Sequence, residues 1–170
     1  GMEWTLGATY NFPEKNCVIC GKDAEFLKGS DMPGFTNNHN HGCVTRTGKD
    51  VRRIITEVDN PYFSHILDTG QYVGSPGASG ARGQEDPSLN FYGSIEETAP
   101  LAVHVRCKIY RIQNGTEEWL NYPRIFEILK GVNYNGWLSI VYEGQDVEEE
   151  ATAVPKAVKY LRGLMAEYEA

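Results

Sequence analysis

The chain has 170 residues and a net charge of −7, from 23 acidic and 16 basic side chains. This acidic balance argues against nucleic acid as a partner, because neutralising phosphates needs clustered Lys and Arg. No apolar run approaches the roughly 20 residues of a membrane-spanning helix. Four cysteines without a disulfide framework fit a reducing compartment, so a cytoplasmic protein without membrane contact is predicted.

A single domain is predicted over residues 1–170, with 2–33 as an irregular N-terminal segment. Within that segment, "WTLGATY" and "NCVIC" contain strand-forming residues. Cys17 and Cys20 form a CxxC pair, and together with His39 and His41 they offer four zinc ligands. A zinc-binding HNH-type protein is therefore one alternative, although the sequence has no second CxxC pair and lacks the positive charge for DNA.

Strand-forming residues gather in four stretches from residue 34 onward. The first is expected to end in "NNHNHG" (37–42). Three others are apolar and rich in β-branched and aromatic residues. They are "YFSHILD" (62–68), "LAVHVRCKIYRI" (101–112) and "GWLSIVYEG" (136–144).

Helical patterns separate these stretches. Apolar residues recur at helical spacing in 50–58, 122–132 and about 152–169, and Pro155 is expected in the first turn of the last helix. Residues 71–92, rich in Gly and Pro, are predicted to form a long loop. The alternation of strand and helix every 30 to 40 residues predicts an α/β protein with a parallel sheet. A closed (β/α)8 barrel takes about 250 residues, so the chain has room for about half of one.

Polar residues gather where the predicted strands end. His39 follows the first strand, Asp68 ends the second, and Glu143 ends the last. In the third strand, His104, Arg106 and Lys108 alternate and therefore share one face. Since ligands of βα proteins bind at the carboxyl ends of the strands, and carboxylates and imidazoles suit divalent cations, this edge is the predicted site.

The motifs "HNHG", "LDTG", "APLAVHVRCK" and "YPRIFEIL…NYNGWLSIVYEG" resemble the C-terminal half of the xylose isomerase-like TIM barrels, the sugar phosphate isomerase/epimerase family. The resemblance runs from about residue 34 to the end of the chain. It implies a TIM-barrel-like fold and a divalent metal ion (Mn, Mg, Zn or Co) held by Glu, Asp, His and Glu. It also implies isomerisation or epimerisation next to a carbonyl of a carbohydrate.

Carried over residue by residue, the resemblance keeps some of the family's ligands and loses others. His39 stands in place of the first Glu, and Val141 stands in place of the last, with Glu143 two residues further on. The family's His falls at His104 or at Arg106, which cannot bind a metal, so the cation is either held differently or lost. The resulting predictions are metal ligands His39, Asp68, His104 and Glu143, catalytic residues Glu143 and Lys108, and substrate-binding residues His41 and Arg106.

Structural roles are the alternatives for several of these residues. Asp68 could cap the turn that follows its strand, Arg106 and Lys108 could pair with Asp68 and Glu143, and His104 could be hydrogen-bonded inside the barrel. His65, within an apolar strand, is expected to pack in the core. Two functions remain open: a sugar isomerase/epimerase-like enzyme, or a non-catalytic half barrel that binds a sugar-like ligand or serves assembly. A homodimer is predicted, because half a barrel leaves two strand edges open.

Overall fold

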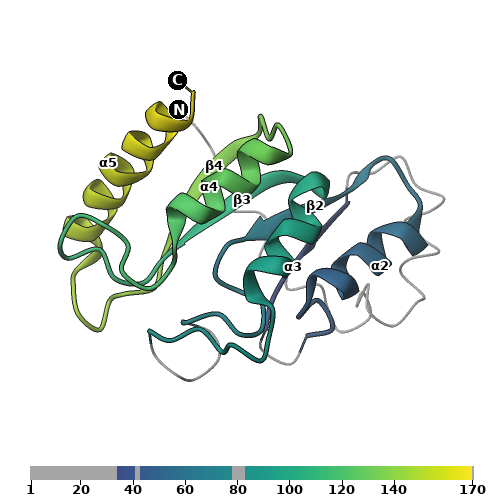
Figure 1. Ribbon diagram of the computed structural model, residues 1–170, viewed down its shortest axis with the longest axis horizontal. Coiled ribbons are helices and arrows are strands. Elements are labelled where there is room, and N and C mark those ends of the chain that lie inside the picture. Colours follow the sequence, from purple (N-terminus) through teal and green to yellow (C-terminus); the bar gives the residue numbers. More distant parts are fainter. Residues whose placement is uncertain (1–33, 41–42, 78–82, 170) are drawn as a thin grey trace.

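The computed structural model describes residues 34–40, 43–77 and 83–169. The predictions for residues 2–33, Cys17, Cys20 and His41 lie outside these ranges. Strands and helices alternate throughout the described part of the chain (Figure 1). The elements are β1 (Gly34–Asn37), α2 (Gly48–Val58), β2 (Phe63–Asp68), α3 (Phe91–Thr98), the 3-10 turn η2 (Ala99–Leu101), β3 (Ala102–Ile109), α4 (Tyr122–Gly131), β4 (Trp137–Tyr142) and α5 (Glu150–Glu169).

The four strands form one parallel sheet in the order β1-β2-β3-β4. Each strand pairs with the next one along the chain, and βαβ crossovers are right-handed in nearly all proteins, so the helices pack on one face. Figure 1 shows them side by side in chain order, from α2 to α5. The predicted α/β fold with TIM-barrel-like βα units is confirmed.

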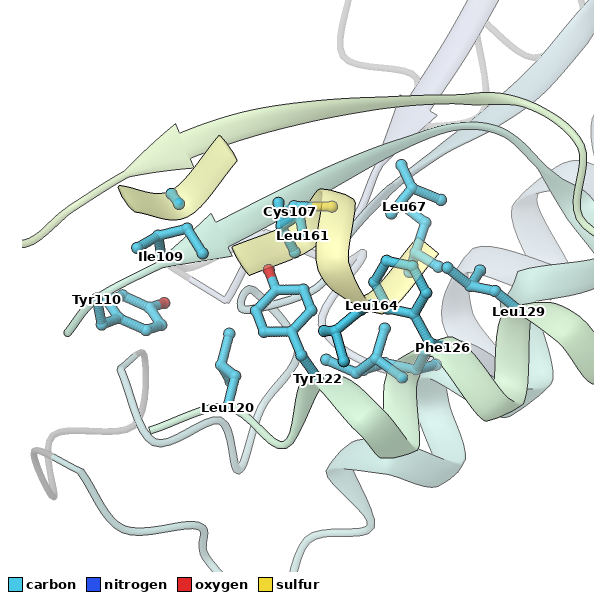
Figure 2. Packing of buried hydrophobic residues seen from close by; sticks show 14 of the residues in the cluster. Leu67, Cys107, Ile109, Tyr110, Leu120, Tyr122, Phe126, Leu129, Leu161 and Leu164 are labelled. Carbon is cyan, nitrogen blue, oxygen red and sulfur yellow. The ribbon is translucent and has the colours of Figure 1, made fainter. Parts of the chain in front are cut away.

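The hydrophobic core lies between this helical layer and the outer face of the sheet. Leu67, Val105, Cys107 and Ile109 alternate with inner-face residues along β2 and β3, and all four are buried. Figure 2 shows Tyr122, Phe126 and Leu129 of α4 and Leu161 and Leu164 of α5 packed around them. Each such side chain contributes roughly 1.5–3 kcal/mol by leaving water, which makes this layer the main support of the sheet.

Helix boundaries depart from the predictions where local hydrogen bonds extend a helix. α2 begins at Gly48, two residues early, because the Thr47 side chain accepts a hydrogen bond from the Asp50 N–H at 3.2 Å. α5 begins at Glu150, so Pro155 lies in its second turn. The prediction that Pro155 belongs to the first turn was wrong.

The predicted loop over 71–92 ends earlier than expected. Phe91 and Tyr92 open α3, whose N-terminus is capped by the Asn90 side chain, which accepts a hydrogen bond from the Gly93 N–H at 3.1 Å. Eight residues give too few turns for a clear apolar period, so the sequence pattern did not predict this helix. Burial of Phe91, Tyr92 and Ile95 stabilises it.

The inner face of the sheet carries no helix among the described residues. Phe35 of β1 is 46% exposed and Trp137 of β4 is 67% exposed, although both are large and apolar. These strands are the two edges of the sheet, each paired on one side within the described ranges. The fold therefore presents the concave interior of an open barrel segment, with the strand ends at its rim.

Candidate functional site

The carboxyl ends of β2, β3 and β4 bring the predicted polar residues together. Asp68 pairs with Arg106 across β2 and β3, and Lys108 pairs with Val141 across β3 and β4. Glu143 follows β4 directly, and its N–H donates to the Ile109 carbonyl at 2.8 Å. The side chains of Asp68, Arg106 and Lys108 consequently share the inner face.

Asn38 fixes the end of β2 from the neighbouring strand. Its Nδ2 donates to the Asp68 carbonyl at 2.8 Å, and its Oδ1 accepts from the Asp68 N–H at 2.7 Å. The Asn38 side chain is fully buried and continues the β1–β2 ladder by one step after β1 ends at Asn37. In "NNHNHG" the second Asn thus acts as a structural clamp on the candidate site.

Thr69 fixes the end of β3 in the same manner. Its N–H donates to the Arg106 carbonyl at 3.0 Å, and its Oγ1 accepts from the Lys108 N–H at 2.9 Å. The Tyr122 hydroxyl from α4 donates to the Lys108 carbonyl at 2.6 Å. The backbone of Lys108 is therefore held from both sides, by the "LDTG" turn and by the helical layer.

A line of four alternating charges crosses the strand ends. Arg106 Nε lies 3.6 Å from Asp68 Oδ2, Lys108 Nζ lies 3.4 Å from the same oxygen, and Lys108 Nζ lies 2.5 Å from Glu143 Oε1. Side-chain exposure is 1% for Asp68, 2% for Lys108 and 46% for Glu143. Of the two carboxylates in the line, Asp68 is therefore buried, whereas solvent and a ligand can reach Glu143.

Asp68 is buried with only part of its hydrogen-bonding capacity used. Its Oδ1 accepts from the Gly70 N–H at 3.0 Å, while Oδ2 accepts no hydrogen bond within the described ranges. Burial raises the pKa of the Asp68 carboxyl, and the Lys108 and Arg106 cations act in the opposite direction. The predicted turn-capping role is present in the Gly70 bond, and the buried Oδ2 faces the Lys108 and Arg106 cations.

Gly70 leaves room for the Lys108 side chain. A Cβ at Gly70 would lie 2.5 Å from Lys108 Cγ and 2.8 Å from the Tyr110 hydroxyl oxygen. Tyr110 in turn donates to the Gly70 carbonyl at 3.1 Å. The glycine of "LDTG" is therefore required by this packing, because any side chain would push Lys108 away from Asp68.

The predicted metal ligands do not converge. His104 lies two residues before Arg106, about 7 Å further down the strand, and its Nε2 is 2.7 Å from Ser139 Oγ. Burial and the neighbouring Arg106 lower the pKa of His104. His39 lies beyond the end of β1, partly buried. No group of three or more His, Cys, Asp or Glu able to hold a metal exists in the described part of the chain.

The space between the two strand-end carboxylates is instead taken by an ammonium group. Asp68 and Glu143 are the acidic pair that a divalent cation would need, and Lys108 Nζ already contacts both. A buried dication would then face Lys108 and Arg106 at close range without an added carboxylate. The described residues do not fit the metal ion that the family resemblance implies.

The buried His65 side chain has a structural role. His65 is fully buried, as expected, with Nδ1 at 3.1 Å from the Thr36 carbonyl and Nε2 at 3.3 Å from the Tyr72 hydroxyl. Burial lowers the pKa of His65 to about 4. The imidazole is therefore neutral at pH 7, and Nδ1 donates to the carbonyl.

The sequence pattern did not reveal Glu117, which organises the loop between β3 and α4. Its Oε2 accepts from the N–H groups of Tyr110 and Arg111, at 2.8 and 3.0 Å. Its Oε1 accepts from the N–H groups of Trp119 and Leu120, at 3.0 and 3.3 Å. Burial raises the pKa of Glu117 to about 7, against the effect of these four bonds. An acidic residue in a polar loop carries no distinguishing signal, so only the tertiary structure shows it.

Comparisons with known proteins bear on the fold. No protein-family model matches the sequence, and no curated protein matches it. Among solved structures, D-psicose 3-epimerase from Clostridium cellulolyticum H10, solved with D-tagatose, is similar with a TM-score of 0.54 and 14% identity, over 78% of this chain and 48% of that one.

Two other solved structures agree with this match. The 3-keto-D-glucoside 4-epimerase YcjR from E. coli has a TM-score of 0.50 and 20% identity, over 78% of this chain and 45% of that one. An L-ribulose 3-epimerase has a TM-score of 0.50 and 15% identity, over 81% of this chain and 42% of that one. The chain spans less than half the length of each of these three structures. Its described part has the fold of a segment of a TIM barrel, as the sequence resemblance predicted.

Proposed function

We propose that this chain is a sugar isomerase/epimerase-like protein that moves a proton on a carbon next to a carbonyl of a carbohydrate or polyol. The observation that carries the proposal is the ion-pair line Asp68–Lys108–Glu143 at the carboxyl edge of the sheet. Ligands of βα barrels bind at this edge. The similar solved structures are sugar epimerases by name, which supports a carbohydrate as the ligand.

Each residue of the line has a role that its burial and charge suit. Glu143 is exposed enough to reach a substrate carbon and is the proposed general base. Lys108 is the proposed hydrogen-bond donor to the substrate carbonyl oxygen, since its ammonium donates hydrogen bonds and is held by two carboxylates. Arg106 and His41 are proposed to bind substrate hydroxyl or phosphate groups. Asp68 is proposed to orient Lys108.

A divalent metal on His39, Asp68, His104 and Glu143 remains the rival arrangement for this site. It would polarise the substrate oxygens and so ease the removal of the neighbouring proton. The geometry supports it less than a metal-free site, because His104 lies below the strand ends and bonds to Ser139.

Assembly is part of the proposal. The open edges of β1 and β4 and the exposed Phe35 and Trp137 favour a homodimer in which a second copy covers the inner face. Within the described ranges, none of the helices is both long enough and apolar enough to cross a membrane. We propose a cytoplasmic location, on the basis of the cysteine content and charge.

Proton exchange in heavy water tests the function directly. The chain is incubated with ketopentoses, ketohexoses and their phosphates in D2O, and NMR follows the loss of the proton next to the carbonyl. Exchange that disappears in Glu143→Gln and persists in Glu149→Gln, an acidic residue just before α5, is expected. Thermal stabilisation by a sugar without any exchange would favour the non-catalytic alternative.

A further inference from the structure

Lys108 is the most unusual residue of the inner face. Its side chain is 2% exposed, and burying an ammonium is costly unless charged partners compensate it. Here both partners are present, since Asp68 Oδ2 lies at 3.4 Å and Glu143 Oε1 at 2.5 Å. The Lys108 backbone is fixed by Thr69 and Tyr122, so the ammonium position is set by the fold.

The charges of the site are already balanced without an ion. Asp68 and Glu143 supply two negative charges, and Arg106 and Lys108 supply two positive ones. Lys108 comes from β3 and places its Nζ between a carboxylate from β2 and one that follows β4. A cation that bridged the carboxylates of Asp68 and Glu143 would lie in this position.

We propose that the Lys108 ammonium is the built-in cation of this site and takes the place of a divalent metal. The role of Lys108 in the reaction rests on the proposed function. Its role as the cation of the site does not, and can be tested without turnover. In the reaction, an N–H of Lys108 donates a hydrogen bond to the carbonyl oxygen of the bound sugar and polarises it. No metal ion is then needed to stabilise the charge that develops on this oxygen.

The proton transfer balances between the substrate, these groups and water. Glu143 takes the proton from the carbon next to the carbonyl, the electron pair of that C–H bond forms a carbon–carbon double bond, and the carbonyl π pair moves to oxygen. Lys108 stabilises the resulting enediolate through its hydrogen bond. Return of the proton by Glu143 to the former carbonyl carbon, with the hydroxyl proton of the enediolate moving to the former carbonyl oxygen, gives an isomer. An epimer forms when water supplies a proton to the original carbon on the opposite face and Glu143 gives its own proton to the hydroxide left behind. No oxidant or reductant takes part.

Manganese binding separates the built-in cation from a metal site. Mn2+ is titrated into the full chain and followed by calorimetry and by its EPR signal, with thermal melts in Mn2+ and in EDTA. Wild-type protein is expected to bind no Mn2+ at the strand ends and to melt at the same temperature in both. Lys108→Met keeps the length and removes the charge, so Asp68 and Glu143 are left without compensation. This variant is expected to bind one Mn2+ at least about tenfold more tightly than wild type.

Matched variants assign any binding to these carboxylates. The Mn2+ affinity gained by Lys108→Met should disappear in Lys108→Met combined with Asp68→Asn. Lys130→Met, at an exposed position on α4, should gain nothing. One Mn2+ bound by wild-type protein and lost in Asp68→Asn would overturn the proposal, and so would a folded Lys108→Met variant that binds none. If Lys108→Met does not fold, the wild-type titration alone decides between the built-in cation and a metal site.

The two proposals fail separately. If the Mn2+ results are as expected and no sugar exchanges its proton, the site has a built-in cation but the proposed activity is wrong. If a sugar does exchange its proton and EDTA abolishes this, the activity stands and the built-in cation is wrong.

Discussion

The Asn38 amide forms a two-point hydrogen bond with the backbone of Asp68, at 2.8 Å to the carbonyl and 2.7 Å from the N–H. Both residues are fully buried. The candidate site thus depends on a side chain that lies 30 positions earlier in the sequence.

Asn38→Ala is expected to destabilise the protein strongly. It leaves the buried N–H of Asp68 without a partner, at a cost of about 1–3 kcal/mol in the free energy of unfolding. The Asp68 carbonyl is left with only the Gln71 N–H, at 3.5 Å. Urea denaturation measures this. Asn37→Ala, next to it at the end of β1, is the control and should cost less. Equal stability of Asn38→Ala and wild type would show that the clamp contributes nothing.

His65 is expected to make stability depend on pH. The pKa of this histidine is lowered from 6.5 in the unfolded chain to about 4 in the fold. The unfolded chain therefore binds more protons between pH 6.5 and 4, and the free energy of unfolding falls as pH decreases through that window. The total loss is on the order of 3 kcal/mol, from 1.36 kcal/mol for each pKa unit.

Glu117 acts in the opposite direction over part of the same range. Its pKa is raised from 4.5 to about 7, so its stabilising contribution is present below pH 4.5 and is lost as pH rises towards 7. The comparison of wild type with His65→Asn isolates the histidine, since Asn keeps a donor near the Thr36 carbonyl. Urea denaturation from pH 7.5 to 4 should show a steeper pH dependence for wild type, and parallel curves would contradict the assignment.

Gly70→Ala is expected to disturb the ion-pair line. The added Cβ would lie 2.5 Å from Lys108 Cγ, so Lys108 must shift and its contacts with Asp68 and Glu143 lengthen. We expect a loss of stability of about 1–3 kcal/mol from this overpacking, together with loss of any proton exchange. Gly163→Ala in α5 is the control, because a Cβ there meets nothing within 4 Å. That variant should gain about 0.5–1 kcal/mol, measured by thermal melts of both.

Glu117→Gln tests the organisation of the β3–α4 loop. The Gln side chain keeps one acceptor oxygen, and its NH2 group cannot accept, so two of the four backbone N–H groups lose their partner. A cost of about 1–3 kcal/mol for each is expected, with a change in the fluorescence of Trp119. Glu118→Gln, at an exposed position bonded to Asn114, should leave stability unchanged. The same effect from both variants would argue against the special role of Glu117.

Trp137→Asp is expected to weaken self-association. Trp137 is 67% exposed on the inner face of an edge strand, and a charge there disfavours burial against a second copy. Light scattering at micromolar concentration should give twice the chain mass for wild type and the single mass for the variant. Val44→Asp, at another exposed apolar position, is the matched control. A wild-type monomer that melts cooperatively would contradict the dimer.

The sequence by itself determined the four strands, three of the helices between and after them, and several of the polar residues at the strand ends. Apolar runs and helical periods reflect local contacts, so the strands that contain Asp68, Lys108 and Val141 could be placed within about three residues of their observed bounds. Parallel pairing followed from the alternation of strand and helix. The presence of Asp68 and Glu143 at strand ends followed from the same reasoning, because a strand that is placed correctly also places the residue at its end.

Only the tertiary structure decided how these residues interact. Register across the sheet sets which inner-face residue meets Asp68, and it brings Arg106 beside Asp68 while His104 lies two residues lower. The clamp by Asn38, the room left by Gly70 and the four bonds to Glu117 depend on backbone groups that carry no residue-specific signal. Register shifts of one residue leave local patterns unchanged but move every side chain to the other face. For that physical reason, the sequence could indicate a charged site but not that Lys108 fills its centre.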